Sequence, residues 1–224
     1  MTYKIELQSV DRLTHDVRRL TFEKPAGYDY APGQATDFAL DRDGWREEQR
    51  PFTFTSLPDE ERLEFVIKSY PEHDGVTEQI ADLQPGENVL IGDPWGAIED
   101  KGDGVFIAGG AGVTPFISIL RKKLAEKGTL EGNTLLFSNQ CERDIVMRNT
   151  FEAMPGLRCH WTVTEEKGSP LARGMIDAGM LDDFVDPDRD VCYVCGPDAM
   201  VEAMPEELKK IGVPEDRIVT EDFG

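Results

Sequence analysis

The sequence is poor in positive charge and contains no long apolar stretch. Its 224 residues include 44 Asp and Glu against 24 Lys and Arg, a formal net charge of −20. A surface of this sign repels nucleic-acid phosphate and anionic lipid headgroups, so we expect neither nucleic acid nor a membrane as a partner. No run approaches the 18 apolar residues of a membrane-spanning helix, and the N-terminal residues lack the apolar core of a signal peptide. These absences favour a cytoplasmic protein.

The acidic residues are spread along the whole chain rather than gathered in a tail. Two interpretations of this acidity stay open. One is an ordinary acidic enzyme surface. The other is a halophilic surface suited to high salt, where repulsion between like charges is screened.

Cysteine is scarce, and its spacing argues against a metal or redox centre. Cys192 and Cys195 form a C-x-x-C pair, but they lie in an apolar run that is typical of a strand. Residues i and i+3 of a strand face opposite sides of a sheet. No second metal-spaced pair and no four-cysteine spacing for an iron–sulfur cluster is found, so we expect no metal site.

The chain divides into two halves with different periodicity. Short alternating segments separated by turns predict a small antiparallel β-barrel over residues 1–100. Strands alternating with helices predict a parallel α/β sheet over residues 104–224. The expected barrel strands cover 3–10, 17–22, 36–40, 51–56, 63–70 and 88–91, with a helix over 76–83. The expected α/β strands cover 105–108, 134–138, 158–164, 191–195 and 217–220. The expected helices cover 115–127, 144–154 and 198–211, the last kinked or split at Pro205, and a loop with a weak helix is expected through 172–184.

A glycine-rich turn organises the second half. It follows the apolar run Val105 to Ala108. Gly110 and Gly112 permit a tight turn at which backbone N–H groups and the helix dipole stabilise a pyrophosphate. We expect Thr114 to cap the following helix and Pro115 to occupy its first position. Because proline replaces the third glycine of the dinucleotide fingerprint, this motif alone leaves other α/β folds open.

In the first half, Arg50 precedes the string Pro51, Phe52 and Thr53. A guanidinium suits a phosphate, an aromatic ring can stack on a planar ring, and a hydroxyl can hydrogen-bond the edge of that ring. In an extended strand Arg50 and Phe52 share one face, and Thr53 lies on the other. Taken alone, the string also fits an ordinary strand.

Together with the motifs that follow it, this string resembles the R-x-Y-S-x-x-S motif of the ferredoxin–NADP reductase-like flavoprotein family. The other similar motifs occur in the family's order over nearly the whole chain, at residues 65–68, 75–77, 92–96, 109–115 and 195–197. The resemblance implies FAD bound by the barrel and NADH or NADPH bound by the α/β domain. It favours FAD over FMN because a Gly-Val-Thr pyrophosphate site is present, and we expect no fused ferredoxin domain.

The resemblance also implies residue roles. Arg50 would bind flavin phosphate, Phe52 would stack on the isoalloxazine, and Thr53 would hydrogen-bond near its N5 edge. Further flavin contacts would come from Pro51, Val66, Ile67, Lys68, Gly75, Val76 and Thr77, and nucleotide contacts from Gly110, Gly112, Thr114, Pro115, Cys195, Gly196 and Pro197.

Some positions depart from the family pattern or have two interpretations. Phe52 stands where tyrosine is usual, and Thr53 stands where serine is usual. Cys195 would line the hydride path. Phe223 would cover the other flavin face or merely anchor the tail, and Glu221 is a candidate for the proton and hydride step.

The implied reaction is hydride transfer from the nicotinamide to FAD, followed by electron transfer to a ferredoxin, a flavodoxin or an oxygenase component. Ser138, Arg143 or Arg173 would suit a 2′-phosphate, but Glu142 and Asp144 would repel it, so we favour NADH. Three alternatives stay open: a free-flavin or ferric reductase, an electron-transfer subunit of a larger complex, and a nucleotide sensor. We expect the chain to act as a monomer.

Overall fold

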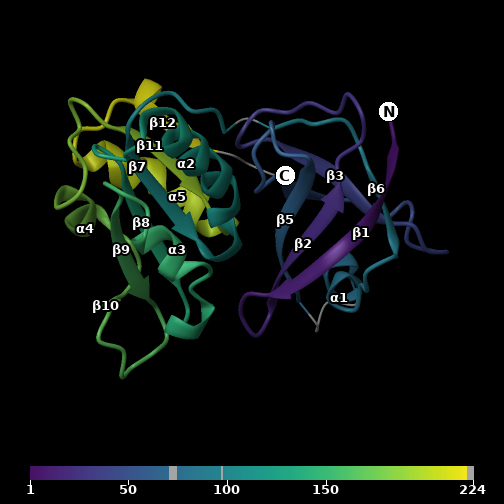
Figure 1. Cartoon of the computed structure of the whole chain (residues 1–224). Coiled ribbons are helices and arrows are strands. Elements are labelled where there is room, and N and C mark those ends of the chain that lie inside the picture. Colours follow the sequence, from purple (N-terminus) through teal and green to yellow (C-terminus); the bar gives the residue numbers. More distant parts are fainter. Residues whose placement is uncertain (71–74, 97, 221–224) are drawn as a thin grey trace.

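The computed structural model describes residues 1–70, 75–96 and 98–220. The chain forms two domains that lie side by side, with the N-terminal half in one and the C-terminal half in the other (Figure 1). No helix in this described part is long and apolar enough to cross a membrane.

The first domain is an antiparallel barrel, as predicted. Its sheet has the order β4-β3-β6-β1-β2-β5. Phe54 bridges to Phe65 of β5, which brings the two edge strands together and nearly closes the barrel. Buried aromatic rings fill the interior, including Phe22, Phe38 and Phe65. The elements are β1 (Tyr3–Arg12), β2 (Val17–Glu23), β3 (Ala35–Leu40), β4 (Arg50–Thr53), β5 (Arg62–Lys68), α1 (Val76–Ala81) and β6 (Asn88–Ile91).

The second domain is the predicted α/β domain, built on a parallel sheet of order β10-β9-β8-β7-β11-β12. Alternate residues of its central strand β7 enter different core clusters. Phe106 packs with α2 on one side, and Val105 and Ile107 pack with α5 on the other. The elements are β7 (Gly104–Gly109), α2 (Thr114–Lys127), β8 (Thr134–Asn139), α3 (Arg148–Glu152), β9 (Arg158–Val163), β10 (Ala172–Arg173), α4 (Ala178–Asp182), β11 (Val191–Cys195), α5 (Asp198–Lys210) and β12 (Ile218–Thr220), with short 3-10 turns at Gly110–Val113, Glu142–Asp144 and Glu215–Arg217.

Of the two outcomes expected at Pro205, a kink or a split of the last helix, the split is wrong, because α5 runs unbroken from Asp198 to Lys210. Proline removes one helical hydrogen bond. Met204 and Leu208 are both buried in the core cluster that α5 covers, and packing of an apolar helix face supplies most of a helix's stability in a protein.

Three other predicted elements are shorter in the structure. The expected helix over 144–154 is a 3-10 turn followed by α3, because Ile145 is extended and Met147 has a left-handed φ of 55°. The loop and weak helix expected through 172–184 contain the short strand β10 and the five-residue helix α4. The strand expected over 51–56 ends at Thr53, where the chain leaves β3 and Thr55 N–H donates to Glu64 O of β5.

Helix α2 faces the barrel and joins the two domains. Val17, Val66 and Ile98 of the N-terminal half share one buried cluster with residues of α2. Arg121 of α2 donates to Thr55 O at 2.7 Å, and its other terminal nitrogen donates to a carboxylate of the barrel domain at 2.6 Å. The interface between the two domains is therefore held by apolar packing and by hydrogen bonds.

Candidate active site

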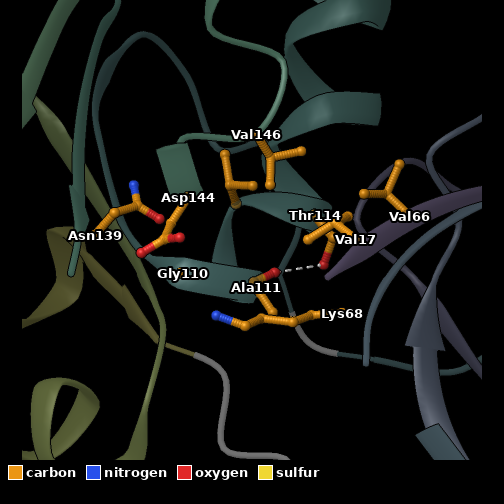
Figure 2. Close-up of a pocket in the computed structure, with 10 residues that line it drawn as sticks. Val17, Val66, Lys68, Gly110, Ala111, Thr114, Asn139, Asp144 and Val146 are labelled. Carbon is orange, nitrogen blue, oxygen red and sulfur yellow. Dashed lines mark hydrogen bonds between the residues drawn. The ribbon is translucent and has the colours of Figure 1, made fainter. Parts of the chain in front are cut away.

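A cleft lies where the barrel, the glycine turn and the loop after β8 meet (Figure 2). The barrel contributes outward-facing side chains of β2 and β5. The glycine turn contributes its backbone and the first residue of α2. The lining residues are Val17, Val66, Lys68, Gly110, Ala111, Val113, Thr114, Asn139, Asp144 and Val146. Four of them, Val66, Lys68, Gly110 and Thr114, are predicted site residues from both halves of the sequence.

Strand alternation in β5 decides which side chains reach the cleft. Ile67 is 1% exposed and packs inside the barrel, so Val66 and Lys68 point the other way. Lys68 Nζ lies 3.2 Å from Asp16 Oδ2. Burial acts to raise the pKa of Asp16, but the Thr14 hydroxyl and Lys68 outweigh it, and the pKa lies below its usual value. The barrel side of the cleft thus presents a positive group held by a paired carboxylate.

The glycine turn differs from the expected geometry at the start of α2. Residues 110–113 form a 3-10 turn that runs directly into the helix, and Gly110 has a φ of +52°. Val113 occupies the N-cap position and Thr114 the first helical position. The Thr114 hydroxyl donates to Ala111 O at 3.0 Å (Figure 2) instead of capping the helix. The predicted capping by Thr114 is therefore wrong, because the 3-10 turn leaves no extended residue at that point.

Gly112 permits a close approach between the glycine turn and the turn that follows β11. A Cβ atom placed on Gly112 would lie 2.3 Å from Cys195 O and 2.5 Å from Gly196 N. Gly109 and Gly196 are similarly crowded by Met200 Sδ, at 2.6 and 2.9 Å. Glycine at these positions lets the end of β11 pack against the glycine turn. Cys195, 3% exposed, is consequently positioned beside the nucleotide motif, although it does not line the cleft itself.

Cys192 and Cys195 face opposite sides of the sheet, as predicted. Cys192 belongs to the cluster under α5 and Cys195 to the cluster under α2. Burial raises the pKa of the Cys192 thiol to about 12. Its thiol is therefore protonated at neutral pH and acts as a core side chain.

The first flavin string lies on β4 at the barrel surface. The Arg50 guanidinium is exposed, donates to Gln49 O at 2.6 Å and makes no ion pair with any described residue. Phe52 is half-buried and packs edge-on against Phe38, with ring centroids 5.3 Å apart. Thr53 is 5% exposed and pairs with Ala35 of β3. An unpaired arginine in so acidic a chain fits a phosphate-bearing ligand.

Other predicted residues are buried or lie at element ends. Val76 at the start of α1 packs in the barrel core, so only its backbone can contact a cofactor. Gly75 precedes that helix, and Thr77 is half-buried. Pro115 is buried and occupies the second position of α2 rather than the predicted first, because the helix already begins at Thr114. Pro197 precedes α5. Glu221 and Phe223 lie outside the described residues.

The sequence analysis did not assign several lining residues to the site, among them Val17 of β2, Asn139 at the end of β8 and Val146 in the turn that follows the 3-10 turn. Asp144, in that 3-10 turn, was considered only as a charge that would repel a 2′-phosphate. The signal for Asn139 was a polar residue at the carboxyl end of a buried parallel strand, where ligands bind in open α/β sheets. Its strand β8 is the direct neighbour of β7, which leads into the glycine turn.

A flavin-type barrel joined to a parallel nucleotide-type sheet, with a cleft between them, defines a class of two-domain oxidoreductase that holds a flavin against a nicotinamide nucleotide. The family model for an oxidoreductase FAD-binding domain matches residues 4–99, and that for an oxidoreductase NAD-binding domain matches residues 106–206. The chain belongs to the ferredoxin–NADP reductase-like flavoprotein family.

Relatives of known function are reductases. The chain is 26% identical over 231 residues to the ferredoxin–NAD(P)+ reductase component of the Pseudomonas putida naphthalene 1,2-dioxygenase system, covering 96% of this chain and 67% of the relative. It is 31% identical over 234 residues to the reductase component of Rhodococcus jostii propane 2-monooxygenase, covering 96% and 61%. The chain thus spans about two thirds or less of these relatives. Its fold matches a Neisseria gonorrhoeae ferredoxin NADP+ reductase with bound FAD and NADP, with a TM-score of 0.86, 17% identity and coverage of 100% and 99%.

Proposed function

We propose that this protein accepts hydride from NADH onto FAD and passes the electrons to an acceptor protein. The observation that carries this proposal is the cleft that brings Val66 and Lys68 of the flavin strand against Gly110 and Thr114 of the nucleotide turn. The bound cofactors supply the redox chemistry, and the protein aligns them and excludes water.

We assign the residues around the cleft to binding and positioning roles. Arg50 neutralises phosphate charge on the flavin nucleotide, and Phe52 covers the flavin ring. Thr53, buried on β4, offers its hydroxyl to the N5 edge. Cys195 shapes the nicotinamide side from the end of β11, where Gly112 allows close packing.

NADH is the proposed donor because carboxylates surround the loops after β8 and β9. Gln140 Nε2 donates to Glu165 Oε1 at 3.1 Å, and Glu142 N–H donates to Glu166 Oε2 at 2.7 Å. These bonds hold glutamates where the additional phosphate of NADPH would need a cation. A 2′-phosphate at this edge of the sheet would meet like charge.

The acceptor is proposed from the relatives and the surface charge. Reductase components of oxygenase systems are among the relatives, which supports a ferredoxin-type carrier or an oxygenase component. Because this protein carries a formal net charge of −20, it repels an acceptor protein with an acidic docking face at low salt. The charge therefore favours an acceptor with a basic docking face, or docking at high salt, where the repulsion is screened. We further propose that the protein is cytoplasmic and monomeric, with its domain boundary in residues 100–104.

An anaerobic titration tests the function. The FAD-loaded protein is titrated separately with NADH and NADPH while the flavin absorbance is followed. We expect bleaching by NADH at lower concentration than by NADPH. Failure to take up FAD would refute the flavin assignment. A flavin that neither nucleotide reduces would instead support the alternative of an electron-transfer subunit that receives electrons from elsewhere.

A further inference from the structure

One face of helix α2 runs from the candidate active site to the barrel. Thr114, Ser118 and Arg121 occupy positions i, i+4 and i+7, which lie on the same side of an α-helix. Thr114 lines the cleft, and the buried Ser118 hydroxyl accepts Gly33 N–H of the barrel domain at 3.1 Å. The helix lies on the side of its domain that faces the barrel (Figure 1). This face therefore connects the glycine turn to the flavin domain.

The Arg121 guanidinium binds the segment that continues the flavin string, residues 50–53. One terminal nitrogen donates to Thr55 O at 2.7 Å, and the other donates to Glu60 Oε1 at 2.6 Å. Thr55 lies two residues beyond Thr53, which we assign to the N5 edge of the flavin. Because a guanidinium presents its donors in a planar fork, two acceptors fix its orientation as well as its position.

The barrel holds this segment on its other side. Thr55 N–H donates to Glu64 O at 2.8 Å, and the Thr55 hydroxyl donates to Glu64 Oε1 at 2.9 Å. Leu57 N–H donates to Glu60 Oε2 at 2.9 Å, so Glu60 binds the segment with one oxygen and Arg121 with the other. A displacement of α2 relative to the barrel therefore breaks these hydrogen bonds or moves the flavin string with the helix.

The contact has more influence on alignment than on stability. The side chains of Arg121 and Glu60 are 30% and 39% exposed, and ion pairs at such exposure contribute about 1 kcal/mol or less to folding. Hydride transfer depends on the distance between two bound cofactors, and a misplacement of about 1 Å can cost roughly 100-fold in rate. The rate is thus the property most sensitive to this contact.

We propose that Arg121 is a positioning residue for hydride transfer, which fixes the flavin string relative to the glycine turn through its hydrogen bonds to Thr55 and Glu60. Arg121 acts through Thr55 and touches neither cofactor. The inference rests on the proposed function and adds a residue to it. One helix face then positions both cofactor sites, with Thr114 at one end and Arg121 at the other.

The test removes the guanidinium and leaves the helix intact. Arg121→Met keeps a long side chain but removes both donors. Lys122→Met is the matched control, because Lys122 is the adjacent cation of α2 and forms its ion pair within the helix, with Glu126 at 3.2 Å. Each FAD-loaded protein is reduced by NADH in an anaerobic stopped-flow experiment, which gives the limiting rate of flavin reduction and the apparent Kd for NADH. The FAD affinity and the Tm are measured separately.

We expect Arg121→Met to lower the limiting rate by about 10-fold or more, with the FAD affinity and the apparent Kd for NADH changed by less than about threefold. Lys122→Met should leave all three quantities unchanged. Arg121→Lys keeps the charge, but one ammonium does not reproduce the planar fork, so its limiting rate should lie between those of Arg121→Met and the wild type. It also provides a second variant in case Arg121→Met does not fold.

Three results would overturn the assignment. A wild-type limiting rate in Arg121→Met or in Arg121→Lys, whatever the Tm, would show that the contact is only structural. Equal losses in Arg121→Met and Lys122→Met would assign the effect to the lost charge. A weakened NADH affinity with the wild-type limiting rate would place Arg121 in nucleotide binding instead. Failure of the proposed function would be visible in the wild type, as a protein that takes up no FAD or whose flavin NADH does not reduce.

Discussion

Replacing Gly112 with alanine tests whether the packing of the two turns positions the reaction. The added Cβ would lie 2.3 Å from Cys195 O and 2.5 Å from Gly196 N. Both neighbours are backbone atoms, which cannot rotate away as a side chain does. Relief to an ordinary contact of about 3.5 Å therefore displaces the end of β11 by about 1 Å.

The expected size of the effect follows from this displacement. Overpacking of this kind costs about 1 to 3 kcal/mol in the free energy of unfolding. For a chain of this size, each kcal/mol lowers the Tm by about 2 to 4 °C. Because a misplacement of about 1 Å at a reacting centre can cost roughly 100-fold in rate, we expect the limiting rate of flavin reduction to fall by 10- to 100-fold.

The assay is anaerobic stopped-flow reduction of the FAD-loaded protein over a range of NADH concentrations, which separates the limiting rate from the nucleotide affinity. We expect Gly112→Ala to lower the rate more than the affinity. Gly168→Ala is the control, since a Cβ on Gly168 meets nothing within 4 Å and its φ lies outside the left-handed region. A Gly112→Ala protein with the wild-type Tm and the wild-type rate would refute the reasoning.

Three further predictions concern charge. Arg50→Ala should weaken FAD binding by about 10- to 100-fold, measured by fluorescence of released flavin. Arg62→Ala, which removes another exposed arginine that makes no ion pair with any described residue, should not weaken it, and equal losses would contradict the phosphate role. Burial acts to raise the pKa of Asp103, but hydrogen bonds from Lys127, Lys123 and a neighbouring amide lower it from 3.8 to about 2. The stability that this ionised carboxylate contributes is complete above its unfolded pKa and is lost as the pH falls from about 4 to 2, so Asp103→Asn should flatten that part of the Tm-against-pH curve, and parallel curves would argue against it. Potassium chloride should raise the Tm by screening a net charge of −20, and a Tm independent of salt would argue against a surface adapted to high salt.

Local patterns predicted most of the elements, because the hydrophobic periodicity of a strand or a helix can be read directly from consecutive residues. The strand expected over 88–91 and that over 191–195 coincide with β6 and β11. Alternation within a strand also predicted that Cys192 and Cys195 face opposite sides of the sheet, which their separate core clusters confirm. These properties depend on neighbours two to four residues away.

The misses share a different cause, namely contacts between distant residues. Pro205 remains inside an intact helix because its neighbours are buried against the sheet. The expected strand at 51–56 ends at Thr53 because closure of the barrel gives the chain a new partner at Glu64. Helical periodicity and strand propensity report only on neighbouring residues, so they predict neither the burial of α5 against the sheet nor the contact that closes the barrel.

The sequence by itself determined the two-domain class, the family and the order of its cofactor motifs, since each motif is a local requirement for turn, strand or charge. Only the tertiary structure decided that Gly112 meets the backbone of Cys195, and that Asn139 and Asp144 complete a cleft with Lys68 from the other domain. The physical reason is that close packing and hydrogen-bond satisfaction are properties of atoms brought together by folding.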